Sequence, residues 1–118
     1  MNIYRQKILQ HYKNPHNKGH LDTPGKKAEL INKSCGDEIK IEVVIKDNKV
    51  TEIAFTGHGC VISIATASIL TDYVKNKSIE EIKKITSEEL IKLIGIEITP
   101  ARLKCLLLPL EAIQKALN

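Results

Sequence analysis

The sequence predicts an α+β fold, because a strand-like pattern in the first half of the chain gives way to helical patterns in the second. Apolar and charged side chains alternate between residues 38 and 56, around one turn signal. From residue 60 onward the alternation is gone, and three cap-like sequences mark helix starts. A length of 118 residues suits one hydrophobic core, so we expect a single domain over residues 1–118.

The first expected element is a helix over residues 3–12, whose apolar side chains fall near one helical face: Ile3, Tyr4, Ile8, Leu9 and Tyr12. Asn14-Pro15 should end it. Residues 14–25 hold little apolar content and read as an extended surface segment. The three histidines nearby, His11, His16 and His20, are expected to be surface residues.

A hairpin follows. Ile39, Ile41, Val43 and Ile45 share one face of a strand that begins near Glu38, and charged residues occupy most of the other face. Asp47-Asn48 tolerates left-handed backbone angles and forms the expected turn. Ile53 and Phe55 alternate with polar residues beyond it. The two strands are therefore predicted to pair antiparallel.

The second half of the chain should be helical. Residues 60–73 contain no internal Gly or Pro and many small and aliphatic side chains, which predicts a mostly buried helix. Capping boxes at residues 78–81 and 86–89 predict two short helices, the second ending at Gly95.

A last helix is expected to open at Thr99-Pro100, as N-cap and first helical residue, and to run toward Leu117. Pro109 lacks an N–H for the carbonyl four residues back, so we expect it to disturb this helix.

Composition excludes several classes of function. The net charge is +4, with much of the excess near the N-terminus, but aromatic residues are only 3% and Trp is absent, so we expect no nucleic-acid partner. Such a basic segment is more often a solvated face or a docking surface for an acidic protein. The longest apolar run, residues 106–110, is too short to cross a membrane. We therefore expect no membrane partner.

Two further features indicate a cytoplasmic location. Residues 1–7 lack the apolar run of a secretory signal, and three cysteines cannot all be paired in disulfides. Both facts favour a reducing compartment.

The three cysteines carry the chemistry that this sequence can offer. Cys35 and Asp37 flank Gly36 just before the hairpin, Cys60 ends a glycine-rich turn, and Cys105 lies early in the last helix. Three thiolates and a carboxylate would fill the tetrahedral shell of zinc or hold a small iron–sulfur cluster. The cysteines are 25 and 45 residues apart, so the tertiary fold would have to assemble the site. His58 is a rival fourth ligand.

Each cysteine could instead be a structural residue of the hydrophobic core, because a single free cysteine is more often buried in the core than bound to a metal. Cys105 fits that reading, since Leu106, Leu107 and Leu108 follow it. Cys35 and Cys60 fit it poorly, because glycine neighbours mark turns. At the start of the helix over residues 60–73, the helix dipole and free N–H groups should stabilise a Cys60 thiolate.

Three segments resemble a known family: residues 32–37 (NKSCGD), 57–68 (GHGCVISIATAS) and 100–105 (PARLKC). They are similar, in the same order, to the signature segments of the IscU/SufU/NifU-N type iron–sulfur cluster assembly proteins. The opening Tyr4-Arg5 and residues 11–19 resemble the SufU branch, although this chain lacks the longer insertion of that branch between the second and third cysteines. Lys104 stands where the IscU branch has a His, and residues 99–104 replace the LPPVK segment that a chaperone reads there.

The resemblance implies a small antiparallel sheet with helices packed on one side. It also implies that Cys35, Cys60 and Cys105 are ligands of a [2Fe–2S] cluster, iron or zinc and candidate sulfur acceptors, and that Asp37 is a labile carboxylate ligand that helps a cluster to leave. The implied partners are a cysteine desulfurase as sulfur donor and apo iron–sulfur proteins or carrier proteins as recipients.

Three functions remain open at this stage. The first is a non-enzymatic scaffold on which a cluster is built, the second a zinc-dependent sulfurtransferase that shuttles persulfide sulfur, and the third a structural zinc adaptor domain.

Overall fold

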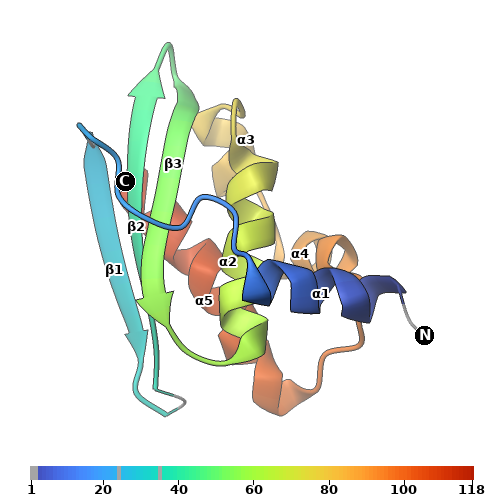
Figure 1. Cartoon of the computed structure of the whole chain (residues 1–118). Coiled ribbons are helices and arrows are strands. Elements are labelled where there is room, and N and C mark those ends of the chain that lie inside the picture. The colour runs from blue at the N-terminus through green and yellow to red at the C-terminus, as the bar shows by residue number, and fades with distance from the viewer. Residues whose placement is uncertain (1–2, 24, 35) are drawn as a thin grey trace.

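The computed structural model describes residues 3–23, 25–34 and 36–118. Its elements, in chain order, are helix α1 (Ile3–Lys13), strands β1 (Lys26–Asn32), β2 (Asp37–Lys46) and β3 (Lys49–His58), and helices α2 (Val61–Val74), α3 (Ile79–Lys83), α4 (Ser87–Ile94) and α5 (Pro100–Ala116). The strands form one antiparallel sheet in the order β1-β2-β3, and the helices lie on one side of it (Figure 1). The predicted α+β fold is confirmed.

The β2–β3 hairpin forms as predicted. Asp47 and Asn48 have φ of 52° and 65°, as a two-residue hairpin turn requires. Ile39 pairs with Gly57, and Ile41 with Phe55, so the apolar rows of both strands face the helices. Because β3 runs directly toward α2, the hairpin delivers the glycine-rich turn to one end of the sheet.

Strand β1 was not predicted from the sequence. It pairs with β2 from Lys26 opposite Val43 to Asn32 opposite Asp37. Its alternation is weak, since only Ala28 and Leu30 pack against the core. Pairing with an already specified strand, rather than a strong pattern of its own, makes this segment a strand.

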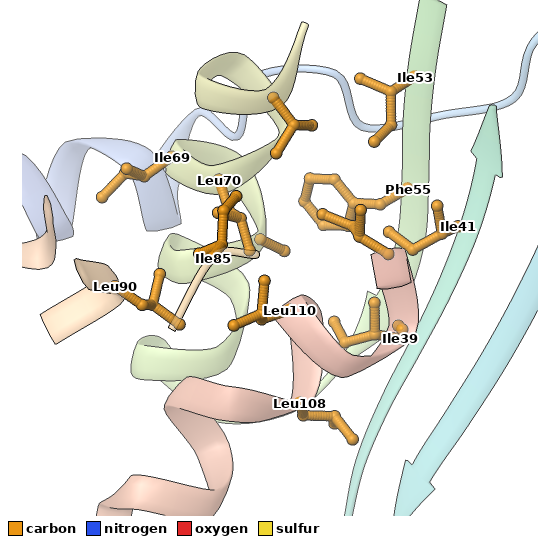
Figure 2. Packing of buried hydrophobic residues seen from close by; sticks show 14 of the residues in the cluster. Ile39, Ile41, Ile53, Phe55, Ile69, Leu70, Ile85, Leu90, Leu108 and Leu110 are labelled. Carbon is orange, nitrogen blue, oxygen red and sulfur yellow. The ribbon is translucent and has the colours of Figure 1, made fainter. Parts of the chain in front are cut away.

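Helices α2 and α5 cover the inner face of the sheet. Figure 2 shows Ile39 and Phe55 of the sheet meeting Leu70 of α2 and Leu110 of α5, all of them at most 4% exposed. Helix α5 runs without interruption through Pro109, which is itself buried, so the expected disturbance is not observed. This packing fixes the start of α5 relative to the start of α2.

Both short helices begin at their predicted caps, although at Thr86 only the bond from the Glu89 amide to the hydroxyl is present, without the reciprocal half of the box. Ser78 accepts from the Glu81 amide while the Glu81 carboxylate accepts from the Ser78 amide, a complete capping box. Gly95 ends α4 at φ 80°. The ring of Tyr4 lies against Gly95 so closely that a Cβ there would be 2.3 Å from Tyr4 Cδ1. Helix α1 is thereby seated on the end of α4.

Residues 14–23, which we call the strap, leave α1, meet β3 at one bridge between Lys18 and Phe55, and cross the sheet toward β1 (Figure 1). The Phe55 amide donates to Asn17 O at 2.9 Å, and the Gly19 amide donates to Phe55 O at 2.8 Å. On the outer face of the sheet, Glu42 accepts from the Leu21 amide at 3.0 Å and its Oε2 lies 2.6 Å from His20 Nδ1. The strap belongs to no helix or named strand, as predicted, but it turns at residues 16–17 instead of being extended throughout, and it is tied to the sheet.

The expectation that His11, His16 and His20 are plain surface residues was incomplete, because all three hold chain segments together. His11 Nδ1 lies 2.6 Å from Ser68 Oγ, and the His16 amide donates to the same hydroxyl at 2.7 Å. Burial, and then the neighbouring His16, lower the pKa of His11. These contacts dock α1 and the strap on α2. None of the described helices combines the length and apolar content that a membrane span needs.

Candidate metal centre

Cys60 is the N-cap residue of α2. Its backbone is extended, with φ −74° and ψ 168°, and its Sγ accepts from the Ser63 amide at 3.5 Å. The sulfur therefore lies at the amino-terminal end of a 14-residue helix and accepts from one of the first backbone amides of that helix. This is the placement predicted from the sequence.

Asp37 is the first residue of β2 and is fully buried. Its Oδ1 accepts from the Cys60 amide at 2.9 Å, and its Oδ2 lies 4.0 Å from Cys60 Sγ. One carboxylate oxygen thus fixes the turn before α2, and the other faces the sulfur. A buried carboxylate needs such a partner, because an isolated one would be costly.

Gly59 makes this approach possible. A Cβ at Gly59 would lie 2.3 Å from Asp37 Oδ1 and 2.6 Å from Ser63 Oγ, whereas real Cβ atoms essentially never come closer than 3.0 Å. The structure shows that Gly59 admits the chain's own carboxylate and hydroxyl.

Cys105 comes from the second turn of α5 and is 2% exposed. One ligand atom each from Asp37, Cys60 and Cys105 lie within 4.8 Å of one another. Two sulfurs bound to one zinc ion are about 3.8 Å apart, given a Zn–S bond of about 2.3 Å and tetrahedral angles. Small side-chain movements would therefore let all three bind one ion, and the donor set of two thiolates and a carboxylate fits zinc or iron.

Cys35 lies outside the described residues. Its predicted part in the site stays a prediction that rests on the sequence and on the resemblance. A fourth ligand is what the three placed donors still require for a tetrahedral shell.

His58 is not brought to this group. Its side chain is 72% exposed, and its Nε2 lies 3.1 Å from Glu38 Oε2 on the outer face of the sheet. Lys104 is likewise exposed. Among the described residues, the group that could hold a metal ion consists of Asp37, Cys60 and Cys105.

A hollow of about 540 Å³ opens beside Cys60. Aliphatic side chains line it from the start of α2 and from the loop before α5, with Tyr12 on one side and Arg102 on another. Cys60 is half-buried, in contrast to Cys105. Of the two described cysteines, Cys60 is the one that a visiting molecule can reach.

Sequence reasoning missed one residue of the site, Ser63. It is fully buried, and its hydroxyl lies 3.8 Å from Cys60 Sγ. The signal was available in the spacing, because a residue three positions after an N-cap lies directly beneath the cap side chain.

The fold and the site together define a small α+β domain that gathers thiolates and a carboxylate at the start of one helix. The model of the NifU-like N-terminal domain matches residues 3–118, and the chain belongs to this family.

Relatives agree with this assignment. The chain is 35% identical to the iron–sulfur cluster assembly scaffold protein IscU of Rickettsia prowazekii, over 97% of this chain and 88% of that protein. It is also 35% identical to the zinc-dependent sulfurtransferase SufU of Bacillus subtilis, over 96% and 88% of the two chains. A crystal structure of a candidate SUF-system scaffold protein from Fervidobacterium islandicum superposes with a TM-score of 0.78 at 27% identity, covering 96% of this chain and 95% of that one.

Proposed function

We propose that this protein is an iron–sulfur cluster assembly scaffold, which accepts sulfur from a cysteine desulfurase and holds iron or a [2Fe–2S] cluster for transfer to apo-proteins. The observation that carries the proposal is the convergence of Asp37, Cys60 and Cys105 from three separate elements. Cys35 is proposed as the remaining ligand. Family membership and the IscU-named relative support the same role.

Sulfur transfer needs an accessible thiolate, and the geometry favours Cys60. Its thiolate would attack the outer sulfur of the donor's persulfide, forming a new S–S bond. The donor's own S–S bond breaks, and its electron pair leaves on the donor cysteine as a thiolate. Asp37 would hold the Cys60 backbone in place during this exchange through the bond from the Cys60 amide.

The same residues would then hold the cargo. Thiolates bind iron strongly, whereas a carboxylate is a weaker partner for a sulfur-rich cluster. Asp37 is therefore the ligand that can be given up first, while its Oδ1 keeps the bond to the Cys60 amide.

Zinc-dependent sulfur transfer is the second candidate. The mixed set of two sulfurs and one oxygen suits zinc, and the SufU relative is as similar as the IscU relative. In this function the metal would stay bound and Cys60 would leave it to receive sulfur. A structural zinc adaptor is the third.

Anaerobic purification followed by metal analysis and visible absorption tests these functions. A scaffold should yield a cluster with thiolate-to-iron absorption, as isolated or after reconstitution with ferrous iron and sulfide. Stoichiometric zinc, with no cluster obtainable by reconstitution, would contradict the scaffold role and favour the shuttle.

Asp37→Ala separates a scaffold from a structural adaptor. Either function predicts a less stable variant, because the Cys60 amide loses its partner. A scaffold variant should nevertheless retain its cluster longer and fail to hand it to an apo-ferredoxin, whereas an adaptor should lose its metal. Glu38→Ala is the matched control, because Glu38 follows in the same strand but faces outward toward His58.

A desulfurase assay tests the sulfur acceptor. Wild-type protein, Cys60→Ala and Cys105→Ala are incubated with a cysteine desulfurase and cysteine, and the gain of one sulfur atom is followed by mass spectrometry. We expect the gain in wild type and Cys105→Ala and its loss in Cys60→Ala. Normal gain in Cys60→Ala would refute the assignment.

A further inference from the structure

The hydroxyl of Ser63 lies beneath Cys60, one turn inside α2. Its Oγ is 3.8 Å from Cys60 Sγ and donates to Cys60 O at 3.2 Å, while the Ser63 amide donates to the same sulfur at 3.5 Å. The residue is fully buried. Two donor groups of one residue therefore face the backbone and the sulfur of the candidate ligand.

Helix formation alone does not call for this hydroxyl. The Cys60 sulfur already caps α2 through the Ser63 amide, and alanine would fill a buried helical position without a polar group to satisfy. The absence of a Cβ at Gly59 also leaves room for the hydroxyl, since a Cβ would lie 2.6 Å from Ser63 Oγ. A buried hydroxyl bonded to Cys60 O, with space left by a neighbouring glycine, therefore also lies against the Cys60 sulfur.

We propose that Ser63 is a positioning residue that controls the Cys60 sulfur as a metal ligand. A hydroxyl carries one proton and two lone pairs and can rotate. While Cys60 is a thiol, both Ser63 Oγ at 3.8 Å and Asp37 Oδ2 at 4.0 Å lie where they can accept from its S–H, and the Ser63 hydroxyl donates to Cys60 O. A metal-bound sulfur has no proton, so the hydroxyl turns and donates to the sulfur instead.

This second donor changes the metal–sulfur bond. Hydrogen bonds to a ligating sulfur draw electron density from it, and they are among the protein's means of tuning such sites. The hydroxyl therefore weakens the hold of Cys60 on its metal relative to a cysteine without such a donor. The inference rests on the proposed function, because it requires that a metal or cluster bind at Cys60.

Cobalt(II), bound anaerobically to the apo-protein, supplies the test, because its thiolate-to-metal charge-transfer band reports the electron density on sulfur. Removing the hydroxyl in Ser63→Ala should shift this band to longer wavelength. The ligand-field bands, which report tetrahedral geometry, should not move. Ser63→Thr keeps the hydroxyl and should keep the wild-type spectrum. Thr66→Val removes another buried hydroxyl of α2 and should also leave the spectrum unchanged.

The possible results are distinct. An unshifted charge-transfer band in folded, cobalt-loaded Ser63→Ala would overturn the inference and leave the proposed function intact. Equal shifts in the Ala and Thr variants, or moved ligand-field bands, would show a merely structural role and would also overturn it. A wild-type protein that binds no cobalt would remove both proposals. If Ser63→Ala does not fold, Ser63→Gly, which lacks the same hydroxyl, takes its place.

Discussion

Replacing Gly59 by alanine should disrupt the hydrogen bond between Asp37 of β2 and the Cys60 amide, which holds the start of α2 against the sheet. The added Cβ would lie 2.3 Å from Asp37 Oδ1, so the carboxylate must move by about 0.7 Å to reach the 3.0 Å limit. Oδ1 is held at 2.9 Å by the Cys60 amide, and this movement would stretch or break that bond. The buried carboxylate then loses its partner.

The magnitude follows from the bond that is lost. A hydrogen bond to a charged group contributes about 1.5–3 kcal/mol, and a buried group left without its partner costs a comparable amount, so we expect about 3 kcal/mol in the free energy of unfolding. At about 2.1 cal/mol/K per residue, unfolding 118 residues has an entropy of about 0.25 kcal/mol/K. The melting temperature should therefore fall by about 12 °C.

Gly19→Ala is the matched control. Gly19 also has positive φ, 135° against 159° at Gly59, but nothing lies within 4 Å of its added Cβ. The backbone cost is at least as large at Gly19, whose φ is further from the extended region, so a greater loss in Gly59→Ala reports the contact with the carboxylate. The assay is urea and thermal denaturation of the metal-free protein, with cobalt titration of each variant. Equal stabilities and equal cobalt affinities would refute the role given to Gly59.

Three further perturbations probe the parts of the fold that support the site. Gly95→Ala places a Cβ 2.3 Å from Tyr4 Cδ1, so α1 should lose its seat on α4, at a cost of about 2 kcal/mol in urea denaturation. Ser68→Ala removes the hydroxyl on which α1 and the strap converge and should cost about 1–3 kcal/mol, with faster hydrogen exchange across α1. Glu42→Gln tests pH dependence: the bond from His20, followed by that from the Leu21 amide, holds the pKa of Glu42 below its ordinary 4.5. Stability from a lowered carboxyl pKa is present above the ordinary value and is lost as pH falls through the folded one, so the advantage of wild type over Glu42→Gln should shrink below about pH 4.5.

Each of these has a control in the same chain. Gly36→Ala meets no atom within 4 Å despite φ 73°, and a loss as large as that of Gly95→Ala would contradict the steric argument. Ser34→Ala changes an exposed hydroxyl, and equal exchange rates in α1 for Ser34→Ala and Ser68→Ala would exclude the docking role. Glu52→Gln changes an exposed carboxyl of β3 and serves as the control for Glu42→Gln. If the free energy of unfolding of wild type and of Glu42→Gln changed with pH in parallel, the contacts of the strap with Glu42 would contribute nothing to acid stability.

The sequence was a good guide wherever local chemistry decides the structure. The hairpin turn at Asp47-Asn48, the capping box at Ser78 and the end of α4 at Gly95 all depend on backbone angles or hydrogen bonds between near neighbours. Local patterns failed for β1, which becomes a strand only because β2 offers it a partner. They also failed at Pro109, where packing of α5 in the core outweighs one missing hydrogen bond.

The candidate site divides in the same way. The sequence was sufficient to predict which residue types form the site, including the carboxylate of Asp37. It also predicted that Cys60 immediately precedes a helix, because a glycine-rich turn followed by a helical pattern is a local signal. Spacings of 25 and 45 residues say nothing about distance, so only packing of α5 against α2 and the sheet brings Cys105 to Cys60. Packing also decided that His58 faces away, that Gly59 makes room for a carboxylate, and that Ser63 lies under the sulfur. Local hydrogen bonds depend on residues that are close in the sequence, whereas contacts between distant segments depend on how the whole core packs.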